Sequence, residues 1–235
     1  PAAVGAGVYQ ISLLIDTVIA SLLPSGSISF LFFADRVNQL PLGVVGVAVG
    51  TALLPLMSRQ LSAADYKGAL NSQNRAIEFS LFLTLPAAVG LVVLAEPTIS
   101  VLFERGAFDV VSARSTAEAL AMYAVGLPAY VVIKALVPGF FARGDTATPV
   151  KIAVFSLLIN GMLNIILMDP FLHAGIAAAT AISAWCNALA LAFILKRRGY
   201  FALDKQNIVR LPRMLVISSL MGAVLFFSLV FLNKF

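Results

Sequence analysis

The sequence predicts an all-α protein, a polytopic transmembrane helical bundle of about seven spans. Hydrophobic residues make up 60% of the chain and charged residues only 11%, whereas a soluble domain has about 45–50% and about 25%. Apolar stretches of about twenty residues recur along the whole chain, each long enough to cross roughly 30 Å of hydrocarbon. They lack the alternation of barrel strands, and helices satisfy every backbone polar group inside lipid.

The predicted spans are separated by short segments with turn or capping signals. Pro24-Ser25-Gly26-Ser27 breaks one helix and starts the next. Ser62-Ala63-Ala64-Asp65 is a capping-box pattern that predicts a short interfacial helix before the third span. Pro97–Phe108 has helical spacing but is too short to span, so we expect an interfacial or re-entrant segment. The spans are Ala2–Leu23, Ile28–Met57, Ala76–Leu94, Ala113–Phe141, Pro149–Met168, Ala174–Leu195 and Leu211–Leu232.

Loop cations predict the orientation, because inner loops carry an excess of Lys and Arg. With the first span running outward, the inner loops hold eleven such residues and the outer loops three. The opposite orientation would invert this bias, so we expect the first residue of the chain to lie inside. The inner set is Arg59, Lys67, Arg75, Arg143, Lys151, Lys196, Arg197, Arg198, Lys205, Arg210 and Arg213; the outer set is Arg105, Arg114 and Lys234.

Composition and motifs argue against an enzyme or a nucleic-acid-binding protein. The net charge of +5 is spread over loops between spans, which favours membrane lipids with anionic headgroups as partners. The chain has one histidine, His173, and one cysteine, Cys186, with neither a nucleophile elbow nor a Walker sequence. We therefore expect no enzymatic activity, no nucleic-acid partner and no intramolecular disulfide.

The charges to be explained inside the predicted spans are Asp16, Asp35, Arg36, Glu78 and Lys134. A central Arg or Lys costs about 2.5–3.5 kcal/mol on insertion scales. Asp16 and Arg36 flank the first turn at similar depth. They either form a structural ion pair, or Arg36 lines an aqueous cavity and presents its planar fork to a phosphate. Lys134 either snorkels to the inner surface or lines the same cavity. Asp35 points about 100° away from Arg36, and Glu78 is interpreted as an interfacial charge.

Neutral polar side chains gather in the fifth and sixth spans. Asn160 and Asn164 lie one turn apart on one face, and Thr180 and Ser183 lie on the next span. Such groups often only hold helices together. The alternative is an oxygen-rich site for a small cation, formed by Asp16, Asn160, Asn164 and Thr180. One carboxylate with neutral oxygens suits a hard monovalent ion better than a transition metal.

Long ordered strings in the chain match one transporter family. The longest runs from Asp35-Arg36-Val37-Asn38-Gln39-Leu40-Pro41 to Thr51-Ala52-Leu53-Leu54-Pro55 and is followed by Ser58-Arg59. The others are Asp16 to Ser27, Leu136 to Arg143 with Thr148 to Lys151, and His173-Ala174-Gly175. Through these strings, almost end to end, the chain resembles the MurJ/MviN lipid II flippases, which belong to the multidrug/oligosaccharidyl-lipid/polysaccharide exporter superfamily.

This resemblance implies one lobe of a two-lobed transporter with fourteen spans in the bacterial inner membrane. Residues 1–235 would be a single lobe, spans seven to thirteen, without the N-terminal lobe and the last span; the start at Pro1 also suggests a piece of a longer protein. The implied substrate is lipid II, a polyprenyl diphosphate carrying a disaccharide peptide, which is flipped by alternating access between the lobes.

The resemblance also implies site residues. The family's cavity arginine on its eighth span matches Arg36, with Lys134 and Asp35 as further candidates for the substrate site. A sodium site of the family matches Asp16, Asn160, Asn164 and Thr180, with the Ile176 carbonyl as a fifth ligand. One family pattern has a carboxylate at the position of Asn164. The site of this chain therefore carries one negative charge fewer than that pattern. No other cofactor is implied.

Two other functions fit the same sequence. A sibling exporter of another polyprenyl-linked glycan or of a drug would share the fold, and only substrate assays separate it from a lipid II flippase. A non-transporting membrane scaffold that recruits envelope enzymes would have no need of Arg36 inside a span.

Overall fold

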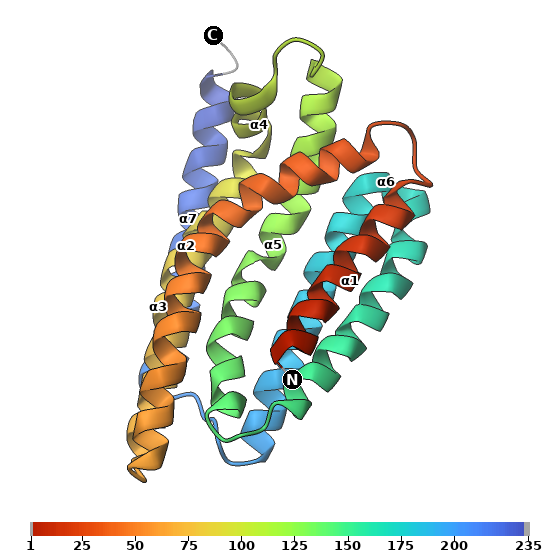
Figure 1. Ribbon diagram of the computed structural model, residues 1–235. Helices are drawn as coiled ribbons and strands as arrows, with labels where there is room; N and C mark the ends of the chain where they lie inside the picture. The colour runs from red at the N-terminus through yellow and green to blue at the C-terminus, as the bar shows by residue number, and fades with distance from the viewer. Residues whose placement is uncertain (1, 233–235) are drawn as a thin grey trace.

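The computed structural model describes the backbone of residues 2–232 and the side chains of residues 11–231. All regular secondary structure in this part of the chain is helical (Figure 1), which confirms the predicted fold class. Five helices, α2, α3, α5, α6 and α7, are long and apolar enough to cross a membrane. The helices are α1 (Ala2–Ala20), α2 (Ser27–Ser62), α3 (Tyr66–Val93), α4 (Ala95–Phe103), α5 (Val110–Phe141), α6 (Ala147–Arg197) and α7 (Lys205–Leu232).

Helix α6 is a hairpin of two membrane-crossing arms. Its backbone breaks at Leu172, where φ is 50° and ψ is −131°. Arg198, which follows the second arm, forms an ion pair with Asp145 and donates to Thr148 Oγ1 at 3.0 Å, so the two ends of the hairpin meet. Burial raises the pKa of Asp145. Hydrogen bonds from Thr148 and from the Arg198 guanidinium lower it by more, so that the pKa falls to about 2. The predicted break between the fifth and sixth spans is therefore confirmed.

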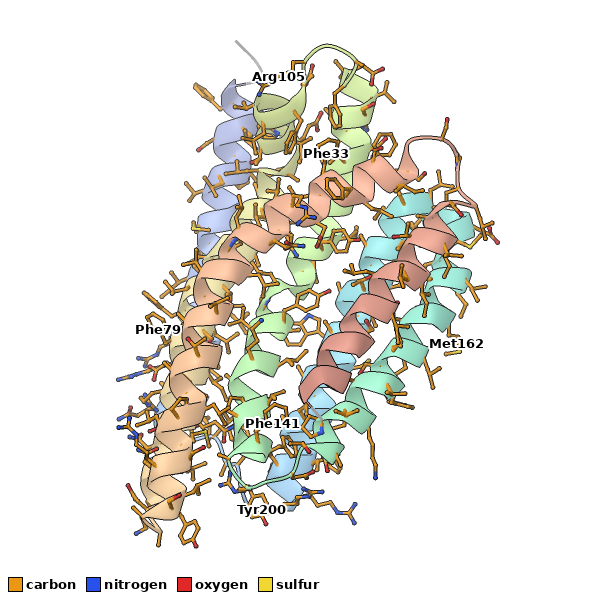
Figure 2. The ribbon with its side chains drawn as sticks, in the orientation of Figure 1. Phe33, Phe79, Arg105, Phe141, Met162 and Tyr200 are labelled. Atoms are coloured by element: carbon orange, nitrogen blue, oxygen red, sulfur yellow. The ribbon has the colours of Figure 1, made fainter. Side chains whose placement is uncertain are left out.

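The loops sort to the two ends of the bundle as the charge pattern predicts. Figure 1 shows the connections after α2, α5 and the second arm of α6 at one end, and the α1–α2 turn and the α4–α5 loop at the other. In Figure 2, Tyr200 and Phe141 lie at the first end and Arg105 at the second. The two sets of loop cations are thus separated, while Lys234 lies outside the described residues.

Side-chain caps start two of the helices. Asp65 accepts from the Gly68 amide at 2.8 Å and begins α3, while Asp109 accepts from the Ser112 amide at 2.9 Å and begins α5. The prediction of a separate interfacial helix after Ser62 is wrong, because α3 runs without a break from its Asp65 cap to Val93. Its polar first turns simply extend the third span beyond the apolar segment. The short segment expected near Pro97 is α4.

Helix α5 lies at the centre of the bundle and packs against α2, α3, α4 and α6. Its two halves belong to two apolar clusters. One contains Met57, Leu136, Phe140 and Leu195, and the other contains Leu31, Ile99, Leu120 and Ile176. The outer faces of the surrounding helices are also apolar; Phe79 is 53% exposed and Met162 is 58% exposed (Figure 2), as expected for side chains in contact with lipid tails.

The bend of α6 depends on a glycine. A Cβ atom at Gly175 would lie 2.1 Å from the carbonyl oxygen of Leu167 on the other arm, so Gly175→Ala must push the arms apart. We expect a loss of stability of about 1–3 kcal/mol, the usual cost of overpacking, seen as a lower melting temperature of the full-length protein in detergent. Gly161→Ala is the matched control, since a Cβ there meets nothing within 4 Å. Equal melting temperatures for both variants would contradict the proposed role of Gly175.

Candidate functional site

A cavity of about 720 Å³ lies between α1, α2, α5 and both arms of α6. In Figure 1, α1 and α2 diverge from the turn that joins them, and α5 is visible between them. The cavity wall combines apolar and polar side chains from five helical segments, so it is a compartment in which polar groups meet within the membrane-spanning part of the chain. Its polar lining includes Asp16, Asp35, Asn38, Gln39, Tyr130, Lys134, Asn160, Thr180 and Asn187.

Lys134 on α5 lines this cavity. Its aliphatic stem passes close to α2, where a Cβ atom at Gly46 would lie 2.6 Å from Lys134 Cδ. No hydrogen bond or ion pair of Lys134 is found within the described residues, and its side chain is exposed to the cavity. Its ammonium group is therefore available to an anionic ligand.

Arg36 is not among the residues that line the cavity, but its side chain contacts two that are. Its side chain is exposed, donates to Gln39 Oε1 at 3.3 Å and stacks over the Phe32 ring at 4.7 Å from the ring centroid. Phe32, Asp35 and Gln39 all line the cavity. Asp35 accepts a hydrogen bond from the side-chain Nε2 of Gln39. Thus Asp35 belongs to the cavity wall, and its neighbour Arg36 packs against that wall through Phe32 and Gln39.

The ion pair between Asp16 and Arg36, one of the two alternatives from the sequence, is not among the ion pairs of the described residues. Asp16 is buried and accepts instead from Asn164 Nδ2 at 2.6 Å. The reason is the divergence of α1 and α2. Beyond their turn, α1 packs against α6 and α2 packs against α5 and α3.

The structure brings together all the residues of the predicted cation site. Asn164 Nδ2 also reaches Asn160 Oδ1 at 3.3 Å, and Asn160 Nδ2 donates to Thr180 Oγ1 at 3.2 Å. The Thr180 hydroxyl lies 2.9 Å from the Ile176 carbonyl and 3.5 Å from Asp16 Oδ2. Asn160 and Asn164 are almost completely buried. The cluster therefore joins α1 to both arms of α6.

This cluster has the chemistry of a monovalent cation site. It offers one carboxylate together with amide, hydroxyl and carbonyl oxygens, and Asn164 Oδ1 is buried without a partner in the described residues. Rotation of the Asn164 amide would direct this oxygen toward an ion near Asp16. In the observed arrangement, the Asn164 NH₂ group bridges Asp16 and Asn160, so amide donors and a cation would compete for the same carboxylate.

Several residues of the site were not singled out from the sequence. Tyr130 lines the cavity and donates from its hydroxyl to the Thr180 carbonyl at 3.3 Å. It lies one helical turn before Lys134, so the i,i+4 spacing was an available signal. Gln39 gave no such signal, because only the observed side-chain contacts connect it to both Arg36 and Asp35.

The chain is similar to one protein family over its whole length. The family profile that matches residues 1–235 is described as "Lipid II flippase MurJ". A probable lipid II flippase MurJ of Rhizobium meliloti is 47% identical over 226 residues, which cover 96% of this chain and 42% of that protein. One of Vibrio cholerae is 36% identical, covering 97% of this chain and 44% of its own. The chain thus spans less than half the length of these relatives.

Solved structures show the same fold. The inward closed conformation of lipid II flippase MurJ matches with a TM-score of 0.82 and 30% identity over 97% of this chain and 46% of that one. An outward-facing multidrug resistance MATE family transporter of the MOP superfamily matches with a TM-score of 0.73 and 21% identity over 98% of this chain and 52% of that one. At this identity, the second likeness concerns the fold alone.

Proposed function

Because the chain belongs to the lipid II flippase MurJ family, we propose that it forms one lobe of a transporter that flips lipid II by alternating access. The chain is a multi-pass protein of the bacterial inner membrane, and its family consists of flippases rather than enzymes. The resemblance inferred from the sequence strings is confirmed. Transport by the whole protein requires a second lobe as partner, with which this lobe would enclose the substrate.

The observation that carries this proposal is an ammonium group in a membrane cavity that has no hydrogen-bond or ion-pair partner among the described residues. Lys134 lines the cavity and Arg36 contacts two residues of its wall, so two cations can approach the diphosphate of a lipid-linked substrate. Hydrogen bonds between such cations and phosphate oxygens are about twice as strong as neutral ones. Asp35 holds Gln39, which in turn contacts Arg36. We assign Lys134 and Arg36 to diphosphate binding and Asp35 to the orientation of Arg36 through Gln39.

We further propose that the Asp16 cluster binds sodium in the working transporter. Asp16, Asn160, Asn164 and Thr180 would hold the ion, with the Ile176 carbonyl as a fifth ligand, and the bound ion would neutralise the buried Asp16 carboxylate. The orphaned Asn164 Oδ1 supports this assignment. Since these residues come from α1 and both arms of α6, the ion would fix how α1 sits against α6.

The full-length parent should rescue a bacterium depleted of its own lipid II flippase, and Lys134→Ala and Arg36→Ala should not. Each variant loses a charge-assisted hydrogen bond of about 1.5–3 kcal/mol, which corresponds to a loss of flipping of about tenfold or more. Arg197→Ala is the matched control, because Arg197 is the last residue of α6 and does not line the cavity. Rescue by well-expressed variants would remove the cations from the mechanism. If the well-inserted parent failed to rescue, a sibling exporter would become the better assignment.

The sodium assignment predicts opposite effects of two substitutions. Asp16→Asn should abolish the increase in melting temperature that NaCl gives the purified full-length protein relative to choline chloride. Asn164→Asp should enlarge it, because a second carboxylate favours the cation; at ten times Kd the ion would add about 1.4 kcal/mol of stability. Asp35→Asn is the control, since Asp35 lies in the cavity but outside the cluster. Equal responses of the parent to both salts would rule out the site.

A further inference from the structure

Helix α5 contains a proline near its C-terminal end, four residues after the lysine that lines the cavity. Pro138 lies inside the helix and has no amide hydrogen for the carbonyl of Lys134, and its ring pushes that carbonyl away. In a membrane, the carbonyls around such a break must find donors inside the protein. The turn that carries Lys134 therefore cannot hold its shape by its own hydrogen bonds alone.

Gln73 on α3 donates to this turn, at the two carbonyls that follow that of Lys134. Its Nε2 atom lies 3.2 Å from the carbonyl oxygen of Ala135 and 3.5 Å from that of Leu136. The side chain is fully buried, on a face of α3 that also buries Ala69 and Ile77 in the apolar cluster. The helical pattern predicts an apolar residue at such a position. The polar side chain of Gln73 therefore departs from the pattern.

Two further features fit Gln73 into this place. Gly139 gives it space, because a Cβ atom there would lie 2.6 Å from Gln73 Nε2. Gln73 Oε1 is buried and has no hydrogen-bond partner among the described residues, which costs free energy in an apolar core. Within the part of the chain that the structure describes, the Gln73 amide group thus donates to α5 and makes no other polar contact.

We propose that Gln73 is a positioning residue for Lys134: from α3 it holds the Pro138 turn of α5 so that the ammonium group of Lys134 is presented to the cavity. On α2, Gly46 leaves room for the stem of Lys134. The inference rests on the proposed function only in taking Lys134 as a group that binds the anionic headgroup. The position of the turn can be tested separately from transport.

The first experiment measures the position of residue 134 without any substrate. Lys134→Cys is made in the full-length protein with Cys186→Ala and any other cysteine removed, and a water-soluble maleimide reports its access to the cavity. Adding Gln73→Leu should change the labelling rate about fivefold, as expected for the loss of one hydrogen bond. Thr84→Val is the matched control, since Thr84 is buried on the same helix and its hydroxyl bonds only to Ser80 of α3. Equal labelling rates with and without Gln73→Leu in a folded protein would overturn the proposal.

The second experiment asks whether Gln73 acts through Lys134, using purified lipid II as the probe. Gln73→Leu should weaken binding about tenfold in the parent, the loss expected for one hydrogen bond to a charged group, and should have no further effect in a Lys134→Met background. Equal losses in both backgrounds would mean that Gln73 acts independently of Lys134 and would overturn the proposal. Pro138→Ala returns the amide donor of the Lys134 carbonyl and removes the ring clash, so the turn can hold a regular helical shape without Gln73. It should therefore restore binding in the Gln73→Leu variant.

The two measurements separate the inference from its premise. If Lys134→Met binds lipid II as well as the parent does, the substrate role of Lys134 fails. The labelling rate then decides the positioning role alone: a changed rate supports it and an unchanged rate refutes it.

Discussion

The fold depends on one constraint: polar groups inside the hydrocarbon must find partners within the protein, because no water is available there. Helix α5 shows this most clearly, since it is central and carries Pro128 and Pro138. At each proline, a side chain from a neighbouring helix donates to the carbonyl three residues earlier. Trp185 Nε1 lies 3.0 Å from the Val125 carbonyl, and Gln73 Nε2 lies 3.2 Å from that of Ala135. The two proline-containing turns of α5 are thus stabilised by α6 and α3.

The same constraint divides the helical bundle into two sides around α5. On one side, the Asp16 cluster ties α1 to α6. On the other, Asn74 accepts from Asn207 Nδ2 at 2.9 Å and donates to the Ala202 carbonyl at 2.9 Å, which ties α3 to the start of α7. Arg75 adds ion pairs with Glu78 and Asp204 at the same end. The cavity lies between α1 and α2, which belong to different sides. It is therefore a space between the two sides and not a packing defect within either one.

The sequence predicted the elements well because span length, turn residues and loop charge are local properties. Contacts between spans were less predictable. Depth along the helices placed Asp16 and Arg36 at one level, but depth does not determine which neighbour a helix packs against, and α1 turned to α6. The Asn160–Asn164 face was predictable from one-turn spacing. The role of Gln73 could not be predicted. Its hydrogen bonds go to a proline-containing turn on another helix, and the periodicity of α3 carries no information about that contact.

Charge connects the cation cluster to the substrate cavity in the proposed function. Asp16, Asn160 and Thr180 belong to both, since they line the cavity that also contains Asp35 and Lys134. Lys134 and the nearby Arg36 carry two positive charges, and the Asp16 and Asp35 carboxylates carry two negative ones. A diphosphate that enters this cavity therefore meets no net positive charge. A bound sodium ion would neutralise Asp16 and leave one positive charge in excess. Opposite charges a few ångströms apart attract far more strongly in a membrane protein interior than in water. Cation binding at α1 and α6 would therefore favour the anionic headgroup at α5 and α2 through the field in their shared compartment, without a mechanical linkage between the two sites.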